Sequence, residues 1–175
     1  HIVGSSATYR DIDVADHVAL IAFEPEEESP IVFLRLNKNF KKRGLKVSAV
    51  ATKQSIAMDK LKAEFVKVAP GAESSAVATL SLTAKSLILV GERASESAGL
   101  FSAVAALAAK TGAKIAYIPR RAGERGALEA GALGSLLPGG RPVSDAAARV
   151  DIAAAWGVAA LPTEPGRTTA EIISG

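Results

Sequence analysis

The strongest constraint on the fold is an alternation of short apolar runs with longer amphipathic stretches between residues 17 and 118. We predict that the apolar runs form strands at residues 17–23, 46–50, 65–68, 86–91 and 114–118. We predict helices at residues 30–43, 56–63, 74–84, 97–111 and 144–155. Such an alternation is typical of βαβ units around a parallel sheet.

These units predict an α/β fold with a doubly wound, mostly parallel five-stranded sheet of the Rossmann-like type. Because crossovers are right-handed, we expect helices on both faces of the sheet and the strand order 3-2-1-4-5. Residues 1–137 would form this single domain. The residues 138–175 would form an irregular, glycine- and proline-rich C-terminal extension that packs on it. We also expect the sequence to be a fragment of a longer chain.

The boundaries of one predicted helix follow from its capping residues. Ser29 is suited to the N-cap, and Pro30 to the first helical position, where its missing N–H costs nothing. Gly44 is expected to end the helix in the left-handed conformation. In an open sheet of this order, ligands bind beyond the C-terminal ends of the strands, where the winding reverses between strands 1 and 4. The loops to inspect are therefore residues 23–30 and 91–97, with 51–55 and 119–126 beside them.

The composition fits a soluble domain and excludes several kinds of chemistry. Of the 175 residues 49% are hydrophobic, and no apolar run reaches the roughly 20 residues needed to cross a bilayer. The net charge is +3 and only 5% of the residues are aromatic, which argues against a nucleic-acid-binding surface. The absence of cysteine excludes disulfides, thiolate nucleophiles and cysteine-ligated iron–sulfur clusters within these residues. Two histidines, His1 and His17, are too few for a metal cage.

The loops at the switch point lack the motifs that bind phosphate. Neither GxGxxG nor GxxxxGK[ST] occurs in the sequence. The loop after the first strand instead carries four carboxylates, at Glu24, Glu26, Glu27 and Glu28, which disfavour an anionic ligand there. Acidic residues before a helix also complement its dipole, and this is the simpler explanation of the glutamates.

Basic residues form two groups. Arg93, Arg120, Arg121 and Arg125 follow strands 4 and 5, where they could grip an anion or pair with acidic residues across the crevice; we favour pairing, with Glu24, Glu26 and Glu92. A second group is most simply a solvated helix face, with an acidic docking partner as the alternative. Its members are Arg35, Lys38, Lys41, Lys42, Arg43 and Lys46. His17, Met58 and Trp156 are interpreted as packing residues, and no constellation of catalytic groups is evident.

Three stretches together resemble the molybdopterin oxidoreductase superfamily. They are residues 11–30 (DIDVADHVALIAFEPEEESP), the turn Pro70-Gly71-Ala72-Glu73, and residues 126–139 (GALEAGALGSLLPG). They look like that superfamily's D-(I/L)-x-x-A-D…G-x-N-P-x-x-E-x-P element, its PGTD turn and its GALDMG…LLPG segment. Within the superfamily, residues 23–36 and 120–133 are most similar to the G subunit of NADH-quinone oxidoreductase (respiratory complex I), in its alanine-rich actinobacterial form.

The departures from these motifs imply that the cofactor is lost. Ala22 stands where the superfamily has glycine, and Glu24 where it has asparagine. Ala72 and Glu73 replace the threonine and aspartate of its PGTD turn. A methyl group and added negative charge oppose the close approach of a pyrophosphate. The cleft rim would therefore be a degenerate site that binds no cofactor and no metal. It is formed by Ala22, Glu24, Ala72, Glu73, Arg93 and Arg120.

The resemblance implies a non-catalytic structural domain in the G subunit of the proton-pumping enzyme that passes electrons from NADH to quinone. Its iron–sulfur clusters would lie outside this fragment, and its partners would be the rest of the G subunit and other peripheral-arm subunits. The fragment would be soluble, at the cytoplasmic face of the cell membrane, without nucleic acid or direct membrane insertion. The alternative is the molybdopterin guanine dinucleotide-binding domain of an enzyme such as formate dehydrogenase or nitrate reductase. A generic nucleotide-binding domain of the kind found in thiamine-diphosphate enzymes is a third possibility.

Overall fold

The computed structural model describes residues 7–163 and 166–175, so His1 lies outside the described residues. The chain forms two compact units that divide between Arg120 and Arg121. The first unit contains the whole five-stranded sheet. The expected packing of residues 138–175 on the α/β domain stays a prediction.

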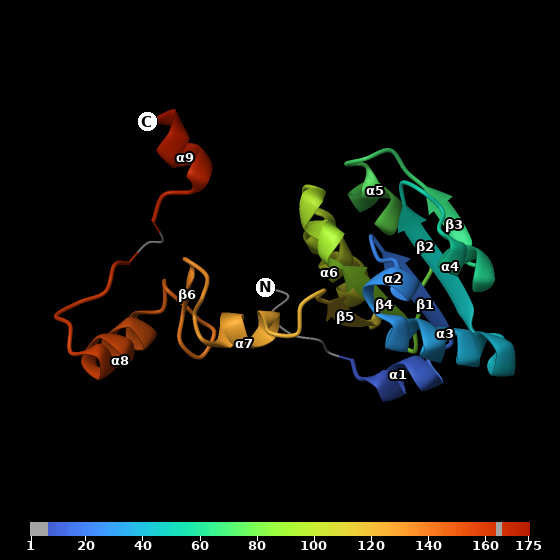
Figure 1. Ribbon diagram of the computed structural model, residues 1–175, viewed down its shortest axis with the longest axis horizontal. Coiled ribbons are helices and arrows are strands. Elements are labelled where there is room, and N and C mark those ends of the chain that lie inside the picture. The colour runs from blue at the N-terminus through green and yellow to red at the C-terminus, as the bar shows by residue number, and fades with distance from the viewer. Residues whose placement is uncertain (1–6, 164–165) are drawn as a thin grey trace. The chain divides into compact units, whose positions relative to one another are not determined.

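The sheet confirms the predicted α/β fold (Figure 1). All its strand pairs are parallel, and the order is β3-β2-β1-β4-β5. The strands are β1 (His17–Ile21), β2 (Lys46–Ala51), β3 (Glu64–Lys67), β4 (Leu87–Gly91) and β5 (Lys114–Ile118). In the register, Val18 of β1 lies opposite Val47 on one side and Leu87 on the other. Every residue of β1 and β4 is buried, as expected for central strands covered on both faces.

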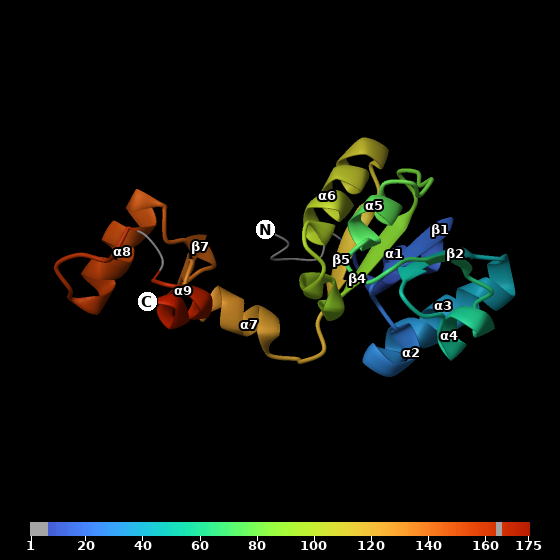
Figure 2. The ribbon, with the colours of Figure 1, turned by 90° about the horizontal axis from the view of Figure 1, so that it is seen from above.

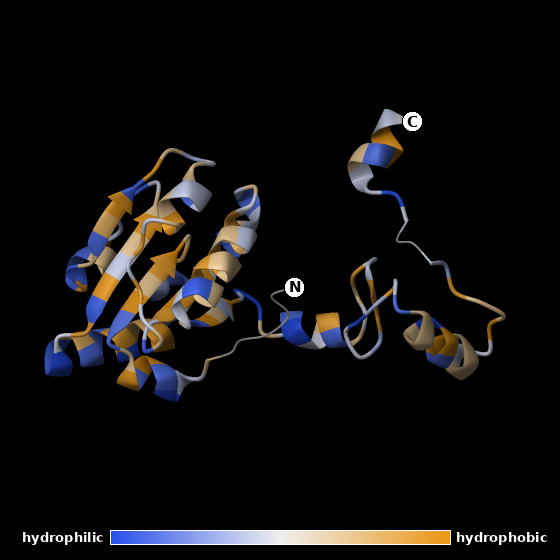
Figure 3. Cartoon of the chain, turned by 180° about the vertical axis from the view of Figure 1, so that it is seen from behind, coloured by the Kyte–Doolittle hydropathy of each residue, from blue (hydrophilic) through white to orange (hydrophobic). Residues whose placement is uncertain are grey.

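Two layers of helices cover the sheet, as Figures 1 and 2 show for this unit. One face packs against α1 (Tyr9–Val14), α3 (Pro30–Arg43) and α4 (Ile56–Lys60). The other face packs against α5 (Glu73–Val77) and α6 (Leu100–Thr111). The strands between the layers are predominantly hydrophobic in Figure 3. This arrangement leaves the loops at the C-terminal ends of the strands to form the polar end of the domain.

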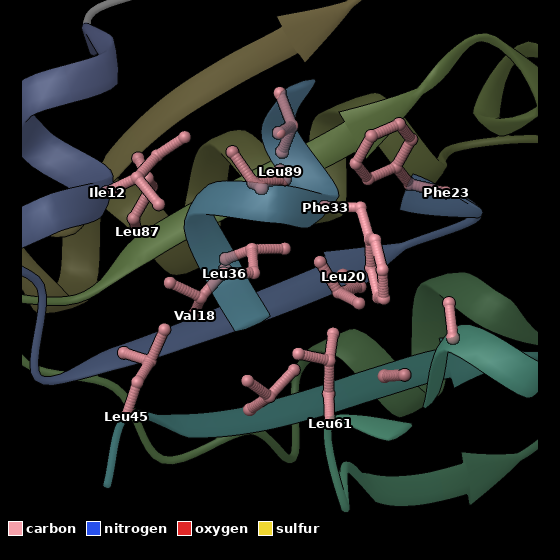
Figure 4. Packing of buried hydrophobic residues seen from close by; sticks show 14 of the residues in the cluster. Ile12, Val18, Leu20, Phe23, Phe33, Leu36, Leu45, Leu61, Leu87 and Leu89 are labelled. Carbon is pink, nitrogen blue, oxygen red and sulfur yellow. The ribbon is translucent and has the colours of Figure 1, made fainter. Parts of the chain in front are cut away.

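Helix α3 shows how the sequence builds one of these layers. Its apolar positions recur every three or four residues, which places Val32, Phe33 and Leu36 on one buried face. Figure 4 shows Phe33 and Leu36 over the strand residues Val18 and Leu20. Full burial of one such side chain stabilises the fold by about 1.5–3 kcal/mol. The helix begins at Pro30 and ends before Gly44, whose φ is 67°, as predicted; the Ser29 side chain makes no capping hydrogen bond.

Several predicted boundaries are wrong, for local reasons. Strand β1 ends at Ile21 because Ala22 turns into the left-handed region, with φ of 47°. Helix α4 ends at Lys60, close to a second left-handed residue, Lys62. Helix α5 is much shorter than the predicted 74–84, and the Thr79 hydroxyl donates to the carbonyl of Ala76 at its end. The predicted helix 97–111 begins only at Leu100, after a 3-10 turn η1 (Glu92–Glu96).

The second unit contains three helices and a short strand pair among its described residues. It contains α7 (Glu124–Glu129), a short antiparallel pair of β6 (Leu136–Leu137) and β7 (Arg141–Pro142), α8 (Ala146–Trp156) and α9 (Thr169–Ser174). The predicted helix 144–155 is close to α8, which begins after Asp145, whose carboxylate accepts hydrogen bonds from two backbone N–H groups. A small core joins α8 to the strand pair through Leu137, Val143, Ala148 and Ile152. Helices α1, α7, α9 and the single turn α2 (Pro25–Glu28) were not predicted.

In the part of the chain that the structure describes, no helix is long and apolar enough to cross a membrane.

Candidate functional site

The switch point between β1 and β4 is organised around Glu28, the last residue of the turn α2. One carboxylate oxygen of Glu28 accepts a hydrogen bond from the backbone N–H of Glu24 at 3.0 Å and another from Arg93, in η1, at 3.1 Å. The other oxygen accepts from Nε of Arg120, beyond β5, at 3.4 Å. The Glu28 side chain is only 6% exposed, whereas those of Arg93 and Arg120 are 44% and 43% exposed. One buried carboxylate thus ties together the segments that follow β1, β4 and β5.

This arrangement supports the prediction that the arginines pair within the crevice, but the partner differs. Neither Glu24 nor Glu26 holds Arg93 or Arg120 in the described contacts. Glu26 instead pairs with Lys60 of α4, with 2.6 Å between Nζ and Oε1. Glu24 caps α2 by accepting from the Glu26 backbone N–H at 3.2 Å. Its second carboxylate oxygen is buried and has no hydrogen-bond partner in the described part of the chain.

Arg121 and Arg125 belong to the other structural unit, so their place beside the crevice stays a prediction. Arg121 pairs with Glu124 at 2.6 Å, and Arg125 pairs with Glu129 at 2.8 Å. Both contacts are local ion pairs of the kind found along an exposed helix. Glu92, another predicted partner of the arginines, is the first residue of η1.

The backbone that directly follows β1 passes close to Gly91, the last residue of β4. A Cβ atom built on Gly91 would lie 2.4 Å from the carbonyl oxygen of Ala22 and 3.0 Å from Cα of Phe23. Only glycine fits at this position, because a real Cβ never approaches a backbone atom so closely. Ala22 itself keeps the left-handed conformation that glycine adopts most readily, with φ of 47°. Ala22, where the resemblance implies glycine, therefore has a glycine-like backbone.

The second motif, Pro70-Gly71-Ala72-Glu73, is tied to the segment that follows β4 and η1. The Glu73 side chain is buried, and its carboxylate accepts a 2.7 Å hydrogen bond from the Ser97 hydroxyl. Ser97 directly follows η1, so the loop before α5 is connected to the loop after β4. Ala72 occupies the N-cap of α5 and offers no polar side chain there. This carboxylate, like that of Glu28, is used to connect loops.

Of the residues interpreted as packing residues, His17 and Met58 are buried, whereas Trp156 is 57% exposed, so its interpretation is wrong. His17 is buried, and its Nε2 lies 3.0 Å from the Ser48 hydroxyl, in agreement with a core position at the start of β1. Burial lowers the pKa of His17, and the nearby Lys46 lowers it further. Among the basic residues of α3, Arg35 pairs with Asp13 at 2.6 Å. Lys38, Lys41 and Lys42 are exposed.

An apolar pocket of about 430 Å³ is lined by residues of α1, α3 and strands β4 and β5, and it reaches Ser29 and Pro119, the neighbours of Glu28 and Arg120 in sequence. Its lining includes Tyr9, Ile12, Val32, Leu89 and Ala116. The pocket was not predicted because α1, which forms one of its walls, was not predicted. The role of Glu28 was also missed, although the spacing of four residues from Glu24 would place the two on one helical face. In the described ranges no group of three or more metal-ligating side chains comes together.

The first unit is thus a doubly wound α/β domain. Its own buried carboxylates, those of Glu28 and Glu73, hold together the loops that follow its strands. No protein-family model matches the chain. The chain is similar, at 45% identity over 97% of its length, to the G subunit of NADH-quinone oxidoreductase from Mycobacterium bovis and from Mycobacterium tuberculosis. It is 46% identical to the protein of the same name from Streptomyces coelicolor, again over 97% of its length. The predicted resemblance to the actinobacterial G subunit of NADH-quinone oxidoreductase is therefore confirmed. The chain spans only 22% of the length of these relatives.

Proposed function

We propose that this chain is a non-catalytic structural domain of a G subunit of the proton-pumping NADH:quinone oxidoreductase. The observation that carries the proposal is the Glu28 cluster, in which the carboxylate of Glu28 pairs with Arg93 and Arg120 beyond the C-terminal ends of the strands. The similarity to G subunits over 97% of the chain supplies the biological context.

A cofactor phosphate at this end would meet unfavourable charge. It would lie near Glu28, which is buried, and near Glu24, which has an unpartnered buried oxygen in the described structure. Two unit charges of the same sign about 4 Å apart repel by roughly 4 kcal/mol at the effective dielectric of a protein surface. The rim residues Ala22, Glu24, Ala72, Glu73, Arg93 and Arg120 are therefore proposed to bind no cofactor.

The electron-transfer chemistry of the proposed complex would be carried by other parts of the protein. The 175 residues contain no cysteine with which to ligate an iron–sulfur cluster. The proposed role of this domain is to pack against the rest of the G subunit and against other subunits of the peripheral arm. The complex would place it at the cytoplasmic face of the membrane. The alternative of a molybdopterin-dependent enzyme is not favoured, because the relatives are named as G subunits of NADH-quinone oxidoreductase.

Calorimetric titration of the chain with GDP and with inorganic pyrophosphate tests the loss of the cofactor site. We expect no binding of either compound in the micromolar range. Micromolar binding of GDP that is abolished by Arg93→Gln would contradict the proposal, because the switch point would then be a working nucleotide site.

Native gel electrophoresis of membranes from the source cells tests membership of the complex. An antibody against this chain should detect the band that oxidises NADH in the gel. Detection only in bands without that activity would argue against the assignment to NADH:quinone oxidoreductase.

A further inference from the structure

The surroundings of Glu28 have the donors of an anion-binding site. The backbone N–H of Glu24 and the guanidinium groups of Arg93 and Arg120 all donate to its carboxylate, at 3.0, 3.1 and 3.4 Å. Guanidinium and backbone N–H groups are also the donors that proteins use to bind phosphate. We propose that these three donors form a binding site for a phosphate or diphosphate group, and that the Glu28 carboxylate is its resident ligand in this chain. The inference rests on the proposed function and names the group that keeps external anions out.

The geometry at the carboxylate resembles the binding of a separate anion. Arg93 donates to one oxygen of Glu28 and Arg120 donates to the other, so the two guanidinium groups bind the carboxylate from two different loops. Two oxygens of a phosphate group offer the same pair of acceptors. The arginine side chains remain 44% and 43% exposed, so solvent reaches the outer side of both groups. The Glu28 side chain itself is almost completely buried, at 6% exposure.

A tethered ligand has a strong advantage over a free one. Because Glu28 lies on a single helical turn next to the donors, its effective concentration is in the millimolar range or above. A dissolved anion must displace this carboxylate, and it must also leave water. The native chain is therefore expected to bind phosphate compounds weakly or not at all, although the donors are present.

Removal of Glu28 changes the local charge balance in favour of an anion. The two guanidinium groups would keep their positive charges, and Glu24 and the exposed Glu27 would remain in the same turn without a cationic partner in the described contacts. Glu26 is already paired with Lys60 at 2.6 Å. The opened position would thus have two guanidinium groups and one backbone N–H directed to it, in place of the carboxylate that they now hold.

The test is calorimetric titration with inorganic pyrophosphate of the wild-type chain, Glu28→Ala and Glu27→Ala. Glu27 is the exposed neighbour on the same turn, and its replacement makes the same change in net charge. We expect Glu28→Ala to bind pyrophosphate at least roughly tenfold more tightly than the other two proteins, as charge-assisted hydrogen bonds replace the lost carboxylate. Adding Arg120→Gln to Glu28→Ala should remove the gain.

Equal affinities of Glu28→Ala and Glu27→Ala would overturn the inference. Circular dichroism establishes that each variant is folded. If Glu28→Ala does not fold, Glu28→Gln, which keeps the side-chain volume, takes its place; absence of a gain over Glu27→Ala would then overturn the inference in the same way. Micromolar binding of GDP by the wild type would count against the proposed function. A wild type that does not bind, together with a Glu28 variant that does not bind, would refute only the present inference.

Discussion

The close contact between β1 and β4 makes Gly91 the most sensitive backbone position of the candidate site. In Gly91→Ala, the new Cβ would lie 2.4 Å from the Ala22 carbonyl oxygen and 3.1 Å from Cβ of Phe23. Neither atom can move cheaply, because the first belongs to the backbone and Phe23 is completely buried. Overpacking of a close-packed interior costs about 1–3 kcal/mol, and we expect about 3 kcal/mol here. In a chain of this size, the corresponding fall in Tm is roughly 6–12 °C.

Urea unfolding followed by far-UV circular dichroism measures this loss, since the only tryptophan, Trp156, lies in the other unit. The matched control is Gly126→Ala. Gly126 lies inside α7, and nothing lies within 4 Å of the position that its Cβ would take. This control should be neutral or gain up to about 1 kcal/mol from helix propensity. A Gly91→Ala variant within about 0.5 kcal/mol of the wild type would refute the close approach of the two strand ends, because a surface substitution costs no more.

Two further predictions concern β1 and the residue that follows it. Ala22→Gly should stabilise the chain by up to about 1 kcal/mol, since glycine relieves the left-handed φ of 47° at some cost in unfolded-state entropy. The control is Ala106→Gly at an exposed helical position, which should lose about 1 kcal/mol. A loss of similar size in both variants would contradict the strain at Ala22. The pKa of His17 is lowered in the folded chain, chiefly by burial, so the unfolded chain binds more protons and the free energy of unfolding should fall as pH drops below about 6.5. Urea unfolding of wild type and His17→Gln at pH about 7.5 and about 5.5 measures this, and equal pH dependence of the two proteins would rule it out.

The order of the sheet was predictable because the strands are compositionally distinct. Residues 87–91 and 18–21 are continuous apolar runs, and such runs are stable only where both faces are covered. The ends of α3 were predictable for a similar reason, since Pro30 and Gly44 restrict the backbone directly. In these places, the local chemistry and the tertiary structure favour the same conformation.

The partner of the arginines was not predictable at the level of single residues. Glu24, Glu26, Glu27 and Glu28 are nearly equivalent in sequence, and the turn that distinguishes them was not anticipated. Glu28 accepts from the backbone N–H of Glu24, and contacts the arginines that follow β4 and β5, only when the turn α2 has formed. Arg121 and Arg125 were grouped with Arg120 because they follow it in sequence, and their printed ion pairs are local, to Glu124 and Glu129.

Helix dipoles alone do not explain the acidic turn. Acidic groups before a helix contribute about 0.3–1 kcal/mol each, and this effect operates at the surface without burial. It applies comparably to Glu26, whose side chain is 32% exposed, and to Glu27, which lies at the surface. Glu28 differs because its side chain is 6% exposed, and a buried carboxylate is costly unless it is paired and hydrogen-bonded. The contacts to Arg93 and Arg120 meet that requirement, so the position of Glu28 is set by the arginines that follow β4 and β5.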